Sequence, residues 1–586
     1  MDPGLRAAAL SVLLLAGAAQ ASASPLLQEA YPDPWTPGEP EEYVVIANSG
    51  PSSPGEGDGP VEGEPRPATP RGRSPHSPAT VADLSGWSLS DGEGGLTFPP
   101  GTSLAPGARV VVARNATAFR AVNLAWPDFE FEDSAPEVPA VAATGNFRLA
   151  NDGDEIVLRS SDGTVADSLA YGRSPGAAGW VGPPVPAPPE GALLFRWSPD
   201  TDTAADWRGP RLLRAGQTRF APEAFVLENV TLFTSPESAL AETVDFLRSA
   251  RQRLVAQLYE FDHRLLAQEL VEAVRRGAGV DLLVEASPVG GVSNSNRALL
   301  GALEEAGVKV TLLHTPRYRF SHAKFAVADG LGVLLMTENW NAAGLPANLR
   351  GNRGWGLKAE NASLAARLEE VARLDATLRP GDSRGRVDRG GPSPLLITTP
   401  PLPGPNWTLG NLTGLLVLGP ESGLEEVRSL LRSARERIEV LQQTVDPTWS
   451  DGASPLLDEL LRAAQRGVRV RLLHQFGDLA GFRARAEGLP VEVRAFAPHG
   501  RVQSPHAKGI IADDRVFVSS FNWNENSFSN NREAGLLLDN ATAAAFFAAS
   551  FDEDWQAAGA APVPWWPFAV AAVAVLLYLR LRRRRR

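Results

Sequence analysis

Two short segments of the chain repeat one pattern of titratable residues. FSHAKFAVADG contains His322, Lys324 and Asp329, and the second segment, SPHAKGIIADD, has the same His-x-Lys-x4-Asp spacing. The second set is His506, Lys508 and Asp513. The whole chain has only four lysines among its 56 basic residues, so two lysines at matching positions stand out. On a strand, residues two apart point to the same face, so each histidine is expected to lie beside its lysine.

These residue types suit the chemistry of phosphodiesters. Negative oxygens shield the phosphorus, so catalysis needs positive charge on those oxygens, a nucleophile on one side and an acid for the leaving alcohol. Two lysines can supply the charge. Two facing histidines can serve as nucleophile and acid, through a phosphohistidine intermediate. The pattern predicts phosphodiester chemistry that needs neither a metal nor another cofactor.

The two segments occupy matching places in an internal repeat. LRSAR occurs at 247–251 and again at 431–435, an offset of 184 that the two histidines and the two lysines share. In the first copy, strand-like VAQLY and VDLLV flank a helical segment, which is typical of a sheet with helices on both faces. Ser235-Pro236 is predicted to begin an earlier helix. We therefore predict two α/β units at 223–377 and 414–557, joined by a Pro- and Gly-rich linker at 378–413.

The doubled motif, with an Asn-Trp-Asn after each copy, resembles the phospholipase D superfamily over residues 223 to about 557. The resemblance implies that His322 attacks the phosphate and that His506 does the acid and base work. The residues that it places in the catalytic machinery are His322, Lys324, Asp329, His506, Lys508, Asp513 and Glu533. The residues that it places against the substrate are Asn339, Asn522 and Ser520.

The first copy departs from the family pattern in two places. Thr337-Glu338 stands where small residues are usual, and Gly354 stands where the second copy has Glu533. This implies that Glu533 orients one histidine and that no symmetric partner orients the other. The halves are then unequal, which either divides the roles of the histidines or narrows or abolishes the activity.

Several residues have an ordinary structural explanation. Asp329 and Asp513 could simply hold the turn after each motif. Trp340 and Trp523 are expected in the core, and the remaining histidines of the repeats are expected to be structural. Three arginines precede the motifs, and solvated charge and a phosphate entrance are equally good interpretations of them: Arg317, Arg319 and Arg501.

Residues 30–220 have a different sequence pattern from the two repeats. Short strand-like runs such as ARVVVAR and DEIVLRSSDG are separated by Gly, Pro, Asp and Asn, which predicts an all-β sandwich with a disordered insertion at 50–80. DLSGWSLSDG and LANDGDEIVLRSSDGTVADSLAYG resemble the lamin-tail type of immunoglobulin-like domain. That resemblance implies a binding or spacing module, and we find no catalytic constellation in it.

The two ends of the sequence carry targeting patterns. Residues 1–23 have the charged, apolar and small-residue regions of a signal peptide, with an uncleaved anchor as the alternative. Residues 561–581 can span a bilayer, and the basic tail at 582–586 favours the cytoplasmic side, although a cleavable sorting signal has a similar layout. Six N-x-S/T sequons are compatible with glycosylation. We expect a single-pass protein of the cell membrane whose body lies outside the cytoplasm.

The sequence thus predicts a multidomain protein: an immunoglobulin-like β-sandwich, a duplicated phospholipase D-like α/β domain and one C-terminal transmembrane helix. The leading functional hypothesis is hydrolysis or transfer of a phospholipid headgroup, with the membrane as partner. An extracytoplasmic nuclease is the alternative, which the net charge of −12 mildly disfavours. An inactive cell-surface binding protein is the third hypothesis. The sequence indicates no oligomeric state.

Overall fold

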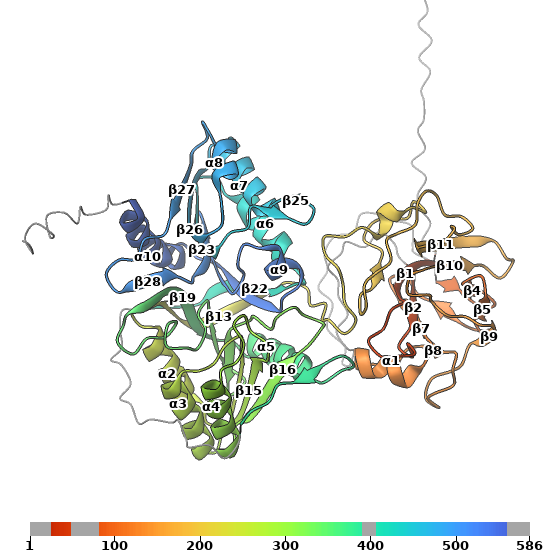
Figure 1. Ribbon diagram of the computed structural model, residues 1–586, viewed down its shortest axis with the longest axis horizontal. Coiled ribbons are helices and arrows are strands. Elements are labelled where there is room, and N and C mark those ends of the chain that lie inside the picture. The colour runs from red at the N-terminus through yellow and green to blue at the C-terminus, as the bar shows by residue number, and fades with distance from the viewer. Residues whose placement is uncertain (1–24, 49–80, 389–405, 560–586) are drawn as a thin grey trace, which may run out of the picture. The chain divides into compact units, whose positions relative to one another are not determined.

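The computed structural model describes residues 25–48, 81–388 and 406–559 (Figure 1). These residues form two compact units that divide between Gly216 and Gln217. The predicted signal peptide, the insertion, the transmembrane segment and the basic tail lie outside the described residues. Within those residues, no helix is long and apolar enough to cross a membrane.

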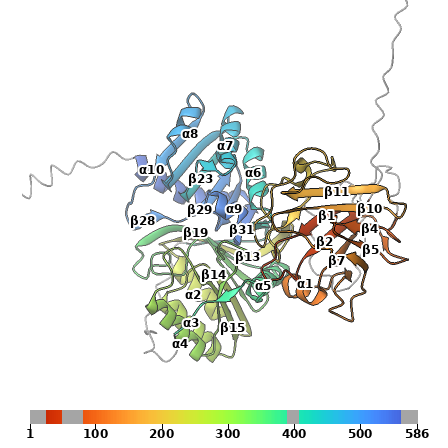
Figure 2. The ribbon, with the colours of Figure 1, turned by 45° about the vertical axis from the view of Figure 1, so that its right-hand side comes forward.

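The first unit is the predicted β-sandwich. Its two five-stranded sheets have the orders β12-β1-β2-β7-β8 and β11-β10-β4-β5-β9. Figure 2 shows β1, β2 and β7 of the first sheet and β4, β5, β10 and β11 of the second. The first strand begins at Pro25, ahead of the predicted boundary at 30. Its strands and helices are β1 (Pro25–Tyr31), β2 (Tyr43–Asn48), β3 (Ala82–Asp83), β4 (Ser88–Ser90), β5 (Gly94–Thr97), β6 (Ser103–Leu104), β7 (Arg109–Ala113), α1 (Ala116–Asn123), β8 (Phe129–Glu130), β9 (Ala142–Gly145), β10 (Gly153–Arg159), β11 (Val165–Gly172), β12 (Leu194–Phe195) and the 3₁₀ helix η1 (Ala204–Trp207).

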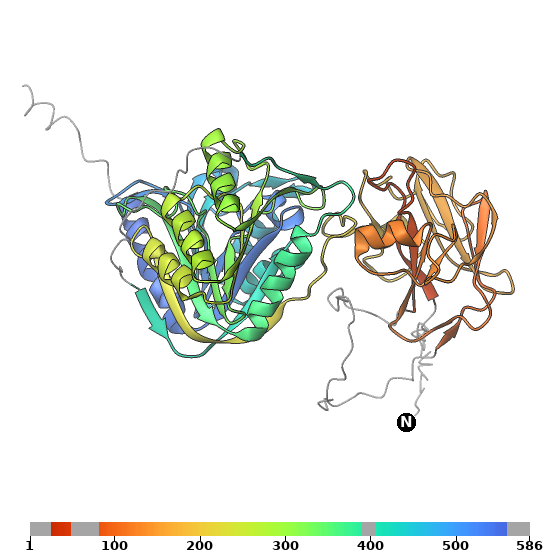
Figure 3. The same ribbon diagram turned by 90° about the horizontal axis from the view of Figure 1, so that it is seen from below.

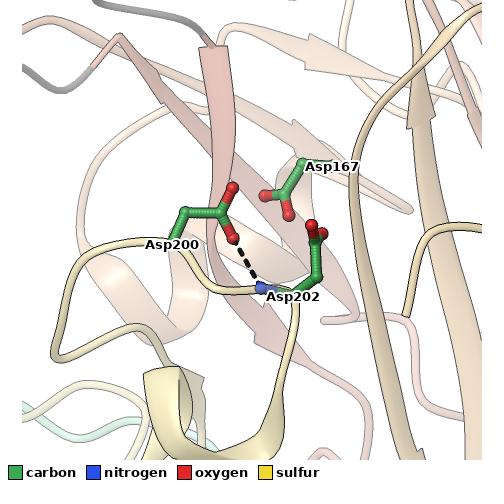
Figure 4. Close-up of side chains that lie close together, drawn as sticks. All are labelled: Asp167, Asp200 and Asp202. Atoms are coloured by element: carbon green, nitrogen blue, oxygen red, sulfur yellow. Dashed lines mark hydrogen bonds between the residues drawn. The ribbon is translucent and has the colours of Figure 1, made fainter. Parts of the chain in front are cut away.

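A buried ion pair ties the two sheets of this unit together. Asp167 of β11 accepts two hydrogen bonds from the Arg196 guanidinium at 2.7 and 2.8 Å and one from the backbone N–H of Leu27 in β1 at 2.6 Å. Asp200 and Asp202 lie close to Asp167, and the Asp202 N–H donates to Asp200 at 3.2 Å (Figure 4). Because the Asp167 carboxylate is already engaged by Arg196, this acidic cluster serves the packing of the sandwich.

The second unit contains two mixed sheets of matching topology. In the first, the strand order is β16-β15-β14-β17-β18-β19-β13, in which β14, β15 and β16 run parallel and the other neighbours run antiparallel. Its elements are β13 (Glu223–Ser235), α2 (Ala239–Ser249), β14 (Arg253–Leu258), α3 (Arg264–Arg275), β15 (Gly279–Glu285), α4 (Asn294–Glu305), β16 (Lys309–His314), β17 (Phe325–Ala328), β18 (Gly332–Met336), β19 (Gly351–Glu360), α5 (Ala362–Ala376) and β20 (Ser383–Arg384).

The second sheet repeats this order with β27-β26-β23-β29-β30-β31-β22. The duplication that the offset of 184 predicts is therefore confirmed strand by strand. Its elements are β21 (Asn406–Leu409), β22 (Leu412–Gly419), α6 (Gly423–Ser433), β23 (Arg437–Thr444), β24 (Thr448–Trp449), β25 (Gly452–Ala453), α7 (Pro455–Gln465), β26 (Arg469–Phe476), α8 (Ala480–Arg485), β27 (Val491–Ala495), β28 (Val502–Pro505), β29 (Lys508–Ala512), β30 (Arg515–Ser519), α9 (Glu525–Ser529), β31 (Glu533–Asp539) and α10 (Ala541–Gly559).

Helices cover both faces of each sheet, as the β-α-β pattern predicts (Figure 3). One core joins α2, α3 and α4 to the first sheet, and another joins α6, α7 and α8 to the second. A central core contains α5, α10 and the facing residues of both sheets. In it, the rings of Trp355 and Phe547 stack with 4.8 Å between their centroids. This shared core, together with the antiparallel pairing of β13 with β22, makes the two repeats one unit.

Two local predictions are wrong. Ser235 does not begin a helix, because its backbone continues β13 opposite Gly354 and its hydroxyl donates to the Gly344 carbonyl at 2.5 Å. Helix α2 starts instead after Ser238. The segment predicted as a linker also contains strands, since β20 pairs with β16 and β21 pairs with β13.

Candidate active site

The two histidine motifs meet where each repeat binds the other. The backbone N–H of His322 donates to the carbonyl of Arg532 at 2.8 Å, and the N–H of His506 donates to the carbonyl of Arg353 at 2.9 Å. Each motif therefore hydrogen-bonds to the Asn-Arg segment of the opposite repeat. Both histidine side chains are largely buried, at 9% exposed for His322 and 11% for His506. Lys508 of the second motif also acts on the pKa of His322, so the two motifs form one shared site, as expected for two histidines that act on one phosphate.

Glu533 orients His322. The Nδ1 atom of His322 lies 2.8 and 2.9 Å from the two carboxylate oxygens of Glu533, which is fully buried at the start of β31. A carboxylate at this distance requires a proton on Nδ1, which leaves Nε2 with its lone pair. Glu533 thus orients one histidine, as predicted, and its carboxylate can also stabilise positive charge that develops on the ring. The edge of the Tyr259 ring packs against the imidazole, with 4.6 Å between ring centroids.

Glu338 takes the corresponding place at His506, so the expectation that Glu533 has no symmetric partner is wrong. The Nδ1 atom of His506 lies 3.2 Å from the Glu338 carboxylate, which is 1% exposed. Gly354 provides the space, because a Cβ atom at position 354 would lie 2.3 Å from the Glu338 side chain. The two departures of the first copy thus compensate each other. The carboxylate comes from the segment after β18, whereas the second copy supplies it from β31.

The lysines of the two motifs are buried beside the histidines. Lys324 Nζ donates to the His322 carbonyl at 2.6 Å, and Lys508 Nζ donates to the His506 carbonyl at 2.7 Å. Burial is the largest cause that lowers the pKa of Lys324 to about 8 and that of Lys508 to about 7, and the Lys324 ammonium lowers the second pKa further. The carboxylates of Glu260, Glu338 and Glu533 oppose both shifts. A bound phosphodiester would supply the negative charge that two adjacent ammonium groups need.

Burial also lowers the pKa values of both histidines. The pKa of His322 falls to about 4, because desolvation and the two lysines together outweigh the neighbouring Glu533. The pKa of His506 falls for the same main reason, with Lys508 as the next cause and Glu338 opposing. Neutral imidazole is what a nucleophile requires, and His322 meets this requirement over the whole physiological range of pH.

The predicted substrate residues divide into two groups. Asn339 and Asn522 follow the motif strands, and each has a buried side-chain oxygen without a hydrogen-bond partner among the described residues. Such oxygens are available to a ligand. Ser520 differs from the prediction, because its hydroxyl is fully buried and bonds the backbone of Ala534 at 3.0 and 3.2 Å. It positions the strand that carries Glu533, whose pKa the hydroxyl also helps to lower.

The structure separates Asp329 and Asp513 from the histidines. The Asp329 carboxylate accepts hydrogen bonds from the backbone N–H groups of residues 251–253 at 2.7 to 3.2 Å, and Asp513 accepts those of 435–437 at 2.8 to 2.9 Å. Asp329 lies beyond the far end of β17, so about 16 Å of strand separate it from Lys324. Both aspartates have a positive φ of 53°. They hold the turns, which is the structural explanation that the sequence left open.

Substitution of Asp513 by alanine is therefore expected to lower stability and to spare catalysis. The change removes three backbone contacts and places alanine at a positive φ, so the free energy of unfolding should fall by about 1–3 kcal/mol. Denaturant unfolding measures the loss, and kcat measured well below the melting temperature should stay within about threefold. Asp513→Asn is the control, because asparagine tolerates this φ and keeps one acceptor. A hundredfold loss of kcat in a folded Asp513→Ala protein would contradict this account.

The three arginines before the motifs have different environments. Arg317 is 1% exposed and pairs with Asp382 at 2.8 Å, so it is structural. Arg319 and Arg501 are exposed, and both remain candidates for a phosphate entrance. Trp340 and Trp523 are fully buried, as predicted.

Sequence reasoning missed three residues of the site: Tyr259, Glu260 and Glu338. The first two follow β14 directly, at the end of the strand that lies nearest to the motif. The sequence does carry a signal for Glu338, because this acidic residue stands beside Asn339 in the copy that has Gly354 where the other has Glu533. Together, Glu338 and Gly354 indicate that the first copy supplies its carboxylate from position 338.

Comparison with known proteins agrees with this geometry. The family model described as "Cardiolipin synthase, PLD-like domain" matches residues 243–374 and again 427–555, one match in each repeat. The Lamin Tail Domain model matches residues 77–173 in the first unit.

Individual relatives are distant. The "5'-3' exonuclease PLD4" of Mus musculus is 28% identical over 174 residues, which cover 24% of this chain and 34% of that protein. The chain therefore spans about a third of the length of that relative. Two solved structures are also similar. Phosphatidylserine synthase of Haemophilus influenzae Rd KW20 has a TM-score of 0.41 at 13% identity and covers 57% of this chain and 88% of its own. The phospholipase D family member Nuc of Salmonella typhimurium has a TM-score of 0.23 at 18% identity and covers 28% and 99%.

Both repeats thus match the same family model, and each contributes one histidine, one lysine and one carboxylate to a shared buried site. The chain therefore contains a duplicated PLD-like domain together with a lamin tail domain.

Proposed function

We propose that the chain is a phosphodiesterase that works through a covalent phosphohistidine. The observation that carries the proposal is the pair of buried histidines, each with a glutamate at Nδ1 and a lysine alongside. His322 Nε2 forms a bond to phosphorus while the bond from phosphorus to the leaving oxygen breaks, and His506 gives that oxygen its proton. His506 then takes a proton from water or a second alcohol, whose oxygen attacks the phosphorus and releases His322.

The two halves favour this division of roles. His322 has the better aligned carboxylate, with two Glu533 oxygens within 2.9 Å, whereas His506 has a single contact at 3.2 Å. A ring that becomes positively charged when it bonds to phosphorus gains most from the closer carboxylate. Lys324 and Lys508 hold the oxygens that do not leave.

We further propose that the substrate is a phospholipid. Two large apolar residues are exposed near the site: Val289, in the segment after β15, at 76%, and Phe476, the last residue of β26, at 55%. The N–H of Val289 donates to Tyr259, which packs on His322, and Gln475, next to Phe476, accepts from Ser504 near His506. Exposed apolar side chains on both sides of a phosphate site suit contact with a lipid surface.

A nuclease remains the second candidate. The Mus musculus relative is named an exonuclease, and the exposed Arg319 and Arg501 precede the two motifs.

The headgroup reaction is tested with the full chain in detergent, with EDTA present, on phospholipid vesicles and on single- and double-stranded DNA. Release of headgroup that His322→Ala and His506→Ala both abolish would support the proposal. Cleavage of DNA alone, lost in the same variants, would assign the chain to the nucleases, and no turnover by the wild type would favour a binding role.

We also propose that the catalytic unit lies outside the cytoplasm, tethered by residues 561–581. The sequence patterns described above support this, as do sequons at exposed positions such as Asn229 and Asn411. Protease digestion of intact cells that produce the full chain tests the orientation, because only an external catalytic unit would be degraded.

The pKa values predict an acidic optimum for kcat/KM. His322 must be neutral, and its pKa near 4 sets the rising limb. His506 must be protonated as the acid, and the two lysines must be protonated as cations. Burial lowers the pKa of His506 below its ordinary value, so His506 sets the falling limb before Lys508 loses its proton at about pH 7. Because kcat/KM reports the free enzyme, its maximum is expected on the acidic side of pH 7. A profile of kcat/KM from pH 3 to 10 measures it, and an optimum above pH 8 would contradict the assignment.

A further inference from the structure

Glu260 makes the site chemically asymmetric. Its carbonyl accepts from the N–H of Trp340 at 3.3 Å, and the carbonyl of Thr444 accepts from the N–H of Trp523 at 3.1 Å, so residues 260 and 444 are structural equivalents. Only the first repeat therefore has a carboxylate at this position. The mechanism proposed above assigns no role to it.

Glu260 lies on the more open side of the cluster of glutamates. It is partly exposed, whereas Glu338 and Glu533 are 1% and 0% exposed. Its Oε2 atom accepts hydrogen bonds from the side-chain amides of Asn339 and Asn341, both at 3.0 Å. Its charge also raises the pKa values of both catalytic lysines. Glu260 is thus close to the phosphate position and is reached by solvent.

The contact fixes the orientation of Asn339. The amide must turn its Nδ2 toward the Glu260 carboxylate, so Oδ1 points away from it, and this oxygen is buried without a partner among the described residues. A phosphodiester has acceptor oxygens only, so it cannot donate a hydrogen bond to Asn339 Oδ1. A buried acceptor left unpaired is costly, so the ligand that fits must bring a hydrogen-bond donor.

We propose that Glu260, with Asn339, is a specificity-determining residue that binds a hydrogen-bond-donating group, an ammonium or a hydroxyl, on the alcohol portion of the substrate beside the phosphate. The inference rests on the proposed phosphodiesterase function and names the headgroup class that the site accepts. Headgroups that carry such a donor are favoured over apolar headgroups of the same size. Asn522 in the second repeat also has a side-chain oxygen that is unpaired among the described residues, but Thr444 provides no charge beside it, so only the Glu260 side combines a carboxylate with the amide oxygen.

Binding to a variant that cannot turn over tests this inference. The full chain with His322→Ala is titrated with dibutyroyl phosphatidylethanolamine, phosphatidylglycerol and phosphatidylpropanol, which offer an ammonium, a hydroxyl and no donor in the headgroup. We expect the ethanolamine or the glycerol lipid to bind about tenfold more tightly than the propanol lipid. Whichever of the two is preferred identifies the donor. Adding Glu260→Thr, which copies position 444, should reduce the ratio to less than twofold, whereas the effect of the lost charge on the two lysines changes the affinity for all three lipids alike and does not alter the ratio.

Two results would overturn the inference. The first is equal affinity for the three lipids, and the second is a ratio that Glu260→Thr leaves unchanged, which would make Glu260 a positioning residue for Asn339. Glu260→Gln is the conservative variant and should reduce the ammonium preference most, because it removes only the charge. Turnover of the same lipids by the wild-type chain tests the proposed function separately, since the binding ratio does not depend on catalysis.

Discussion

Replacing His322 or His506 with alanine is expected to lower kcat on the natural substrate by about four orders of magnitude. His322→Ala removes the atom that bonds to phosphorus, so it should abolish turnover of every phosphodiester. His506→Ala removes the proton donor for the leaving group. This variant should still form the phosphohistidine from a p-nitrophenyl phosphodiester, because p-nitrophenolate leaves without a proton. That variant should then release one equivalent of p-nitrophenol and stop, because the second step lacks its base.

A matched pair of variants controls for loss of structure. Alanine at 322 leaves Glu533 buried without its partner, whereas His322→Asn keeps a donor near the carboxylate. Both variants should lose activity alike, although the asparagine protein should unfold closer to the wild-type temperature. Retention of kcat within tenfold in either His322 variant would contradict the assigned roles.

Arg532→Met is expected to cause the largest loss of stability. The guanidinium is 0% exposed and contacts Asp375 of α5 at 2.8 Å and Glu421 at 2.7 Å, and it also bonds the Tyr318 hydroxyl. Its removal leaves two buried carboxylates without a cation, which costs about 3–5 kcal/mol. Urea unfolding measures this cost. Activity should fall as well, because the Arg532 carbonyl holds the backbone of His322.

Arg353→Met is the internal control, since Arg353 occupies the equivalent position in the first repeat. Its partners are the buried Asp554 at 3.0 Å and two more exposed glutamates, Glu237 and Glu553, with side chains 27% and 61% exposed. The exposed carboxylates regain water, so the loss should be smaller, about 1–3 kcal/mol. A larger loss for Arg353→Met than for Arg532→Met would contradict the explanation from buried charge.

The repeat and its site were predictable because their signals are local. The spacing identifies the paired motifs, and one offset of 184 relates the two copies. The β-sandwich likewise follows from short strands between turn residues. These features depend on neighbours in sequence, which periodicity reports directly. The expectation that each histidine shares a strand face with its lysine is wrong, because both histidines lie just before the strands β17 and β29.

The rest depends on contacts between distant segments. Glu338 and His506 are 168 positions apart in sequence but lie 3.2 Å apart in the structure. The role of Gly354, which is to leave room for the Glu338 side chain, follows only from that arrangement. The same holds for Ser520, whose hydroxyl turned out to bond a neighbouring strand. Asp329 and Asp513 stand at motif positions, but only the three-dimensional arrangement shows that their carboxylates bind loop amides. Burial and cross-repeat pairing decide these roles, and neither is visible in spacing.

Trapping the covalent intermediate tests the central claim most directly. The full-length His506→Ala chain is mixed with a p-nitrophenyl phosphodiester, quenched under alkaline conditions that preserve phosphohistidine, digested and analysed by mass spectrometry. The account predicts one adduct per chain on the peptide that contains His322, and no adduct when His322→Ala is added. An adduct on a different residue, or an adduct that persists in the double variant, would contradict it.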